Sequence, residues 1–362
     1  MYKIDKEIPL IKNMIYFIKW SLASLTIGLV TGAVGTAFGH GVLRASAFFL
    51  AHPFMVLFLP VSGLIILGIY HLLREEKNRG TNMVIEAIYS DTEVSFTTLP
   101  AIFLGTILTH LAGGSAGREG AALQMGGSIG NQFARVFHLD EKDKKIAVMC
   151  GMSGTFAALF GTPLAAAVFS MEVISIGVMY YAALVPCLFS AFVGAYVSGN
   201  LGLVPEAFEI GTFPAFDLKG AVVIVVFGMF CAVASEFFCI SLHRAEGLYK
   251  KYLPSPFKRI VSGGVLVAVM TLAVGTTRYN GSGISLIEEC FAGDVKVWDF
   301  AVKILFTVVT LEAGFKGGEI VPTLAIGASF GAAAALLTGQ ALGLMTACGM
   351  VGVFVGATNC PI

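Results

Sequence analysis

Long apolar runs, separated by short polar segments, constrain this chain more than any other feature of its sequence. Several reach the roughly 20 residues that a membrane-spanning helix needs, whereas others extend for only about 10–15. Charged residues form 13% of the chain, about half the share of a typical soluble domain, so the surface suits lipid better than water. The sequence therefore predicts an all-α, polytopic integral membrane protein. The runs lie at about Met14–Val42, Phe48–Leu73, Leu99–Ala112, Ile146–Val168, Ile174–Val197, Ala221–Leu242, Ile260–Val274, Val302–Leu311, Leu324–Leu337 and Ala341–Val355.

Glycine interrupts the shorter runs, and the chain contains 43 glycines in 362 residues. Small residues allow membrane helices to pack closely. Short apolar pieces broken by glycine are typical of half-helices that meet near the membrane midplane. We therefore expect broken and tilted helices around a central site, in addition to complete spans.

Cations next to the first two runs predict which side of the membrane they face. Two crossings return the chain to its starting side, and loops rich in lysine and arginine stay in the cytoplasm. The first run is too long for a signal peptide and has no convincing cleavage site, so we expect it to be the first membrane helix. The sequence thus predicts a multi-pass protein of the plasma membrane. The flanking cations are Lys3, Lys6, Lys12, Arg74, Lys77 and Arg79.

An internal repeat organises the chain. Its strongest matches, THLAG with TLEAG and GGSIG with GASFG, share an offset of 201 residues. Four matches in the same order indicate duplication rather than chance similarity between apolar helices. In chain order they pair residues 80–81 with 281–282, 109–113 with 310–314, 126–130 with 327–331, and 151–163 with 349–361.

Duplicated halves with glycine-broken segments at corresponding positions are typical of a transporter whose site lies between the halves. We expect an inverted-topology repeat, with residues 80–200 as the first repeat and residues 281–362 as the second. Residues 1–79 then form N-terminal membrane helices, and residues 201–280 form the membrane helices that connect the repeats. A membrane-embedded enzyme or a structural membrane protein is the alternative, but the sequence has no cluster of His, Asp or Cys at membrane depth.

The segment GGSAGREG, residues 113–120, precedes an apolar stretch and offers a candidate anion site. No Gly-Lys-Ser/Thr follows it, which disfavours a nucleotide-binding loop. A helix that starts near the midplane presents unpaired N–H groups and the positive end of its dipole to an anion. The carboxylate of Glu119 can occupy such a site itself, and after protonation it would leave the site and carry a proton. An ionisable residue in such a segment is a functional candidate.

These segments resemble the signature of the CLC family of anion channels and anion/proton antiporters, from about residue 80 to residue 362. The resemblance implies inverted halves and a homodimer with one pore per subunit. It also implies that Glu119 is the gating glutamate and that the backbone N–H groups of Gly120, Ile320 and Val321 hold the anion. The matching segments are Gly117-Arg118-Glu119-Gly120 with Gln124 and residues 126–130, residues 151–165 with Phe169 and Glu172, and Gly317-Gly318-Glu319-Ile320-Val321-Pro322.

Departures from the chloride-transporting pattern resemble the fluoride-transporting branch of the family. Chloride-type members have Gly-Ser-Gly-Ile-Pro at the first half-helix, where this chain has GTNMV at residues 80–84, and Ala121 replaces the proline after the gating motif. The Gly-Ser-Gly-Ile at residues 281–284 is the second-half counterpart. Fluoride is a small, strong hydrogen-bond acceptor that suits amide and N–H donors. We expect the anion to be contacted by Thr81, Asn82 and Met83.

Val173 stands where chloride/proton antiporters of the family often have a second glutamate, the inner proton relay. Taken alone, Val173 would indicate a passive channel. Glu319 offers another protonatable group, because the offset of 201 places it at the position of Arg118 and so near the same central site. We expect it to exchange a proton with Glu119; the alternative is a solvated charge in the vestibule.

Other features receive structural interpretations. We interpret Glu312 and Lys316 as a structural ion pair. The seven cysteines lack CxxC spacing and the six histidines lack ligand spacing, so we expect no disulfide, no metal and no cofactor. A net charge of zero without a basic tract disfavours nucleic acid as a partner.

Together these features predict a proton-coupled fluoride exporter, a fluoride/proton antiporter of the bacterial plasma membrane. Its partners would be fluoride, protons and the lipid bilayer. A chloride or other halide antiporter or channel on the same scaffold is the first alternative, and a membrane-embedded enzyme with Glu119 as general base is the second.

The last residues of the chain lie where the repeat predicts that a helix starts, as at Pro163. The family continues with two more helices, one at the dimer interface and one that brings a tyrosine to the anion site. We therefore expect the sequence to be a fragment and assign no pore tyrosine.

Overall fold

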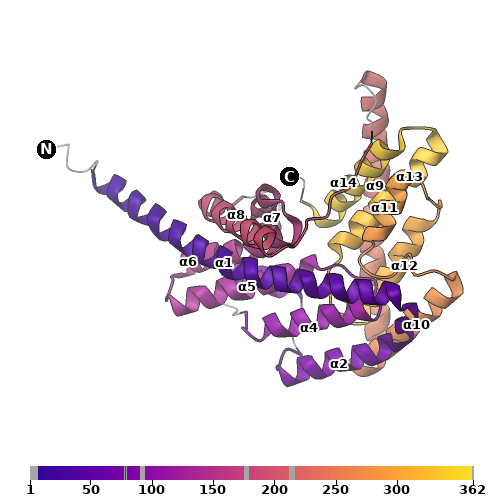
Figure 1. Cartoon of the computed structure of the whole chain (residues 1–362), viewed down its shortest axis with the longest axis horizontal. Helices are drawn as coiled ribbons and strands as arrows, with labels where there is room; N and C mark the ends of the chain where they lie inside the picture. Colours follow the sequence, from indigo (N-terminus) through magenta and orange to yellow (C-terminus); the bar gives the residue numbers. More distant parts are fainter. Residues whose placement is uncertain are drawn as a thin grey trace.

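The computed structural model describes residues 7–76, 78, 80–89, 94–174, 179–211 and 217–360. Within these ranges the chain is helical, and its one β-type pairing is an isolated bridge (Figure 1). Lys77, Arg79 and Pro361, which the sequence analysis used, lie outside the described residues, as do Lys3 and Lys6. The elements are α1 (Glu7–Ala51), η2 (Pro53–Phe58), α2 (Leu59–Leu72), α3 (Thr81–Tyr89), α4 (Thr98–Leu111), α5 (Glu119–Val136), α6 (Glu141–Phe160), α7 (Pro163–Glu172), η3 (Tyr181–Ala183), α8 (Leu184–Asn200), α9 (Leu218–Tyr252), α10 (Pro256–Val274), α11 (Ile284–Ala292), α12 (Asp299–Glu312), α13 (Ile320–Thr338) and α14 (Leu342–Thr358).

Six helical segments of the described chain are long and apolar enough to cross a membrane. Large apolar side chains such as Tyr196 on α8 and Met229 on α9 lie exposed on their outer faces, where lipid rather than water is the suitable solvent. The shorter apolar helices α4, α7 and α14 are the broken elements that the glycine pattern predicts. The prediction of an all-α, polytopic membrane protein is confirmed. The six segments are Asn13–Ala51, Pro53–Leu72, Tyr181–Asn200, Leu218–Tyr252, Pro256–Val274 and Ile320–Thr338.

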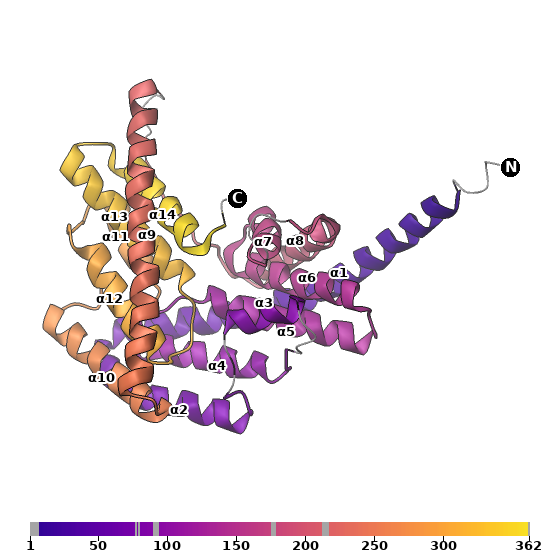
Figure 2. The same ribbon diagram turned by 180° about the vertical axis from the view of Figure 1, so that it is seen from behind.

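Helix boundaries recur along the chain at the offset of 201 found in the sequence. α4 and α12 correspond over their whole length, and α5 and α13 begin at Glu119 and Ile320, which are 201 residues apart. α6 and α14 begin at the same spacing, at Glu141 and Leu342. Figures 1 and 2 show α4–α6 on one side of the molecule and α12–α14 on the other.

The same offset relates α1 to α9, which end at Ala51 and Tyr252. The sequence analysis treated these helices as a flanking and a connecting segment, because their apolar residues share no motif. Lipid-facing residues interchange freely as long as they stay apolar, so sequence similarity fades there before helix length does. The residue limits of the four predicted segments stay a prediction.

Glycines hold the paired helices of each half at close range. A Cβ added to Gly126 of α5 would lie 2.2 Å from the carbonyl oxygen of Gly151 of α6. A Cβ added to Gly327 of α13 would lie 2.3 Å from the carbonyl oxygen of Gly349 of α14. Such contacts require glycine and allow the helix axes to approach closely. They fix the directions in which the N-termini of α5 and α13 point.

Buried apolar side chains form one cluster within the first half, around Trp20 and Met149. A second cluster, around Leu59, joins α2 and α10 to the second half. Ala112 and Phe315 belong to the second cluster and anchor the loops before α5 and α13. The core therefore supports both loops that lead to the helix N-termini.

Candidate anion site

The loops that precede α5 and α13 meet in the interior through two backbone hydrogen bonds. The N–H of Gly117 donates to the carbonyl of Gly318 (2.6 Å), and the N–H of Gly318 donates to the carbonyl of Gly117 (2.9 Å). The two glycines are 201 residues apart, so the repeat pairs with itself here. A Cβ at Gly318 would lie 2.6 Å from the backbone nitrogen of Gly120, which leaves room for glycine only.

Glu119, the first residue of α5, is fully buried beside this bridge. Its carboxylate oxygen Oε2 accepts a hydrogen bond from the backbone N–H of Val321 (3.2 Å), in the first turn of α13. The other oxygen, Oε1, has no hydrogen-bond partner among the described residues. A negative group thus occupies the positive end of α13, where N–H groups and the helix dipole favour an anion.

Arg118, the neighbour of Glu119, is buried but points to a different partner. Its Nη2 donates to Oε1 of Glu206 (2.8 Å), and its guanidinium lies 5.4 Å from the ring centroid of Phe160. Its charge is therefore balanced within the protein. Arg118 is part of the support of the site rather than of its wall.

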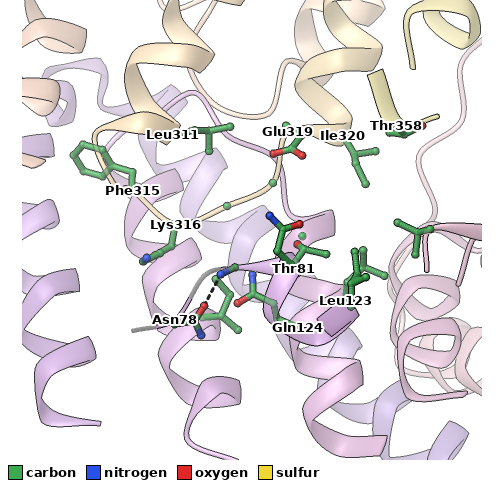
Figure 3. A pocket seen from close by; sticks show the side chains of 18 of the residues that line it. Asn78, Thr81, Leu123, Gln124, Leu311, Phe315, Lys316, Glu319, Ile320 and Thr358 are labelled. Carbon is green, nitrogen blue, oxygen red and sulfur yellow. Dashed lines mark hydrogen bonds between the residues drawn. The ribbon is translucent and has the colours of Figure 1, made fainter. Parts of the chain in front are cut away.

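A pocket of about 400 Å³ opens next to the two helix N-termini (Figure 3). We call it the central pocket. It lies beside the segment after α2, which the sequence places on the cytoplasmic side. Seven of the predicted site residues line it: Thr81, Asn82, Gly120, Gly317, Gly318, Glu319 and Ile320.

A chain of hydrogen bonds fixes the start of α3 in the pocket wall. The N–H of Gly80 donates to Oδ1 of Asn78 (2.8 Å), as Figure 3 shows, and Nδ2 of Asn78 donates to Oε2 of Glu75 (3.2 Å). Glu75 is buried and also accepts from the hydroxyl of Thr98 (3.0 Å). These bonds tie the start of α3 to the start of α4.

Thr81 and Asn82 present polar side chains to this pocket. A Cβ at Gly120 would lie 3.1 Å from Oγ1 of Thr81, so α3 and α5 approach closely at their N-termini. The Thr81 hydroxyl and the Asn82 amide have no hydrogen-bond partner among the described residues. Both therefore have donors free for a ligand.

Met83 and Val321 are the predicted anion contacts that do not line the central pocket, and only the N–H of Val321 reaches the Glu119 carboxylate. Met83 instead packs, partly buried, against the first-half cluster. Successive residues of a helix point about 100° apart, so α3 cannot turn Thr81, Asn82 and Met83 to one side. An anion contact of Met83 stays a prediction, and it would have to lie outside the central pocket.

Glu319 and Ile320 enter the pocket from the second half. Glu319 is the N-cap residue of α13, and its exposed side chain lines the pocket. Figure 3 shows Glu319, Thr81 and Gln124 around the same space, contributed by three different segments. Val173, which replaces the inner proton group, also lines this space.

Several polar residues of the pocket wall were missed from the sequence, among them Glu312, Lys316 and Gln124. Glu312 and Lys316 both line it rather than forming the expected structural pair; the Lys316 ammonium lies 4.3 Å from the ring centroid of Tyr70, and no ion pair of the described residues includes it. Gln124, named only as a motif residue, lines it as well. The repeat could have indicated Lys316 as a site residue. It lies two residues before Gly318, at the position that Ser115 has before Gly117 in the first half.

Among the described residues, no group of His, Cys, Asp and Glu could hold a metal ion. The polar groups at this site are N–H and amide donors, one lysine and several carboxylates.

Comparison with known proteins gives consistent matches over nearly the whole chain. Residues 62–362 match the family model described as "Voltage gated chloride channel". A "Chloride/fluoride channel protein" of Pseudomonas syringae pv. tomato is 35% identical over 354 residues, 96% of this chain and 78% of that protein. An "H(+)/Cl(-) exchange transporter" of Yersinia pestis is 23% identical over 374 residues, 94% of this chain and 77% of that protein.

Solved structures agree with these matches. The crystal structure of a CLC-type fluoride/proton antiporter is 34% identical, with a TM-score of 0.90, and the match covers 95% of this chain and 89% of that one. A slow cyanobacterial Cl⁻/H⁺ antiporter has a TM-score of 0.75 at 20% identity, over 93% of this chain and 85% of that one. The second likeness shows a shared fold.

Proposed function

Because the chain belongs to the voltage gated chloride channel family, the CLC family that its motifs resemble, we propose that it is a fluoride/proton antiporter. Two similar proteins support fluoride: the 35% identical relative is named a chloride/fluoride channel, and the 34% identical structure is described as a fluoride/proton antiporter. The multi-pass helical fold places the chain in a membrane. We propose export of fluoride across the plasma membrane, driven by the proton gradient.

One observation carries the proposal: the buried Glu119 carboxylate accepts the N–H of Val321 at the start of α13. An anion and this carboxylate compete for the same donor. Protonation removes the negative charge that makes the carboxylate a strong acceptor. Protonated Glu119 then leaves the donor to the anion and carries its proton away, which couples the two movements.

Glu319 is proposed as the second proton-transfer group. Its carboxylate lines the pocket at the start of α13, next to the helix end that Glu119 occupies. While ionised it repels an anion in the pocket, because like charges at short range repel each other. Alternation between proton and anion occupancy follows from this exclusion. It also supplies the protonatable group that Val173 lacks.

The donors of the pocket are proposed to select fluoride. Thr81 and Asn82 offer a hydroxyl and an amide, and the N–H groups of Gly120, Ile320 and Val321 lie at the starts of α5 and α13. Fluoride concentrates its charge on a small radius and is a strong hydrogen-bond acceptor, so several converging donors can replace its hydration shell. Chloride is larger and gains less from each donor.

We also propose a homodimer in the lipid bilayer, with one anion path in each subunit. This follows from family membership, and the exposed apolar faces of the spans, such as that around Tyr196 on α8, suit contact with lipid or with a second subunit.

Purified protein in liposomes tests the function. Liposomes loaded with fluoride or with chloride are diluted into halide-free buffer, and anion efflux and internal pH are recorded together. Fluoride efflux should drive proton uptake. In chloride-loaded liposomes, both the anion efflux and the proton uptake should be much slower. Equal flux of the two halides would instead assign the chloride-handling function of the same family, and fluoride efflux without proton uptake would indicate a channel.

A further inference from the structure

We propose that Gln124 is an anion ligand of the central pocket, and that its side-chain amide donates a hydrogen bond to a small inorganic anion. The proposal rests on the proposed function and adds a residue to its path. The proposal places an anion-binding site in the pocket wall, separate from the Val321 N–H group to which Glu119 is bound.

The position of Gln124 on α5 turns it to the pocket. Gly120, Leu123 and Gln124 all line this space, as expected for residues spaced by three and four along one helix face. Gln124 is only 3% exposed. A Cβ added to Gly80 would lie 3.9 Å from its Nε2, so the amide lies against the start of α3. Figure 3 shows the amide close to Thr81 and Asn78.

The amide of Gln124 is unpaired. Its Oε1 is buried without a hydrogen-bond partner, and its Nε2 donates to none of the described residues. Asn131 on the same helix also has a buried oxygen without a partner, but its Nδ2 donates to the carbonyl of Val94 (2.9 Å), so the two residues differ in the amide nitrogen. Buried amide groups normally have partners, since an unpaired one loses its hydration without replacement. The buried Oε1 is an acceptor, so an anion would not pair it. Nε2 is the donor of this amide, and because Gln124 lines the pocket, an acceptor that enters the pocket can accept from Nε2.

The charges around the amide favour an anion as that ligand. The Lys316 ammonium lines the same pocket without a carboxylate partner among the described residues. The hydroxyl of Thr81, which lines the same pocket, is also free to donate. Hydrogen bonds to a charged acceptor are about twice as strong as neutral ones, so an anion is held better than water. The carboxylates of Glu312 and Glu319 also line the pocket. Their negative charges would lower the affinity for the anion, so that it can be released.

Equilibrium binding of the halide to the purified protein tests the inference. Titration calorimetry measures the Kd of fluoride and of chloride for the unmodified protein and for Gln124→Met, which keeps the side-chain length but removes donor and acceptor. Gln132→Met is the matched control, because Gln132 is on α5 but does not line the pocket. Thermal unfolding of each protein is recorded without halide.

Gln124→Met should raise the fluoride Kd about tenfold, the loss expected for one hydrogen bond to a charged group. Its unfolding midpoint should stay equal or rise, because an unpaired buried amide is replaced by an apolar group. Gln132→Met should change neither quantity. A lower midpoint with an unchanged Kd would show a structural role and overturn the proposal. If the Kd is unchanged but the proton-to-fluoride ratio in liposomes is altered, the proposal is overturned. Gln124 would then contact a carboxyl group that transfers protons rather than the anion.

The unmodified protein separates this proposal from the proposed function. If it binds chloride and not fluoride, the fluoride function fails, and the ratio of chloride Kd values between Gln124→Met and unmodified protein decides the role of Gln124. If it binds neither halide, both proposals are overturned.

Discussion

At the start of α5 the first helical residue is a buried glutamate, and at the start of α13 the equivalent residue is an isoleucine. The Glu119 carboxylate reaches across to the N–H of Val321, whereas Ile320 has no group that could reach back. One residue earlier the order is reversed: Arg118 is bound to Glu206 within the protein, while Glu319 faces the pocket. The two helix starts occupy equivalent positions in the repeat, but their charged side chains differ.

This contrast teaches that the two halves share the backbone donors of a helix start but differ in the charged side chains placed on it. A symmetrical pair of helix starts would bind an anion equally from either side. Because the Glu119 carboxylate lies on one helix start and accepts the Val321 N–H of the other, the proposed mechanism has proton and anion compete at this donor. In the same proposal Arg118 supports the site and Glu319 transfers protons.

Removing the charge of Glu119 should have the largest effect. Glu119→Gln imitates the protonated state, so fluoride-driven proton uptake should fall at least about 100-fold, within the range that positioned proton-transfer groups contribute. Simultaneous recording of internal pH and fluoride efflux measures this. Glu209→Gln, at an exposed glutamate of the loop before α9, is the control. Proton uptake that survives in Glu119→Gln would remove Glu119 from the mechanism.

Glu319→Gln should come next, and it separates the two carboxylates. Coupled transport should be lost, as in the first variant, because the inner proton-transfer group is missing. A slow fluoride efflux should persist, since the donors of the pocket and the Glu119 carboxylate are intact. Simultaneous recording of internal pH and fluoride efflux in liposomes distinguishes loss of proton coupling from loss of fluoride efflux. If Glu319→Gln keeps its proton-to-fluoride ratio, Glu319 is a vestibule charge.

Arg118→Leu should destabilise the protein rather than uncouple it. It leaves Glu206 half-buried without a partner, and breaking a buried ion pair costs about 3–5 kcal/mol. Denaturant titration in mixed micelles measures the free energy of unfolding. The double variant Arg118→Leu with Glu206→Leu should recover most of the loss, because two apolar groups replace the pair. A double variant no more stable than the single one would contradict the pairing.

Met83→Leu should have the smallest effect. Met83 packs on an apolar cluster, and swaps that conserve volume usually change the free energy of unfolding by less than about 1.5 kcal/mol. The ratio of fluoride to chloride flux should stay the same. Asn82→Ser, one residue earlier in the pocket wall, should raise the chloride flux. A selectivity change in Met83→Leu alone would restore the anion contact expected from the sequence.

The sequence predicted the fold class, the repeat and the family because their signals are short and local: glycine motifs, helix lengths and an offset of 201 residues that three of the four repeat matches share. It also directed attention to the loops at Gly117 and Gly318, whose pairing explains why both are glycine. The roles of the individual residues there stay predictions.

Side-chain direction and charge pairing could not be predicted in this way. Met83 follows Asn82 in the motif, but the direction of each side chain depends on how α3 packs on its neighbours. Lys316 is four residues from Glu312, a spacing typical of a helical ion pair. α12 ends at Glu312, however, and the loop after it carries Lys316 to Tyr70. The free amide of Gln124 is visible only once its neighbours are known.

The paired hydrogen bonds between Gly117 and Gly318 have a mechanical consequence. Many transporters with inverted repeats expose their site alternately to the two sides of the membrane by rocking one half as a rigid body. Here the halves are fastened together at the site itself, so such rocking would break both bonds at the point where the cargo is held. We therefore expect turnover to rely on smaller motions, such as a rotamer change of the Glu119 carboxylate, that leave the two bonds intact.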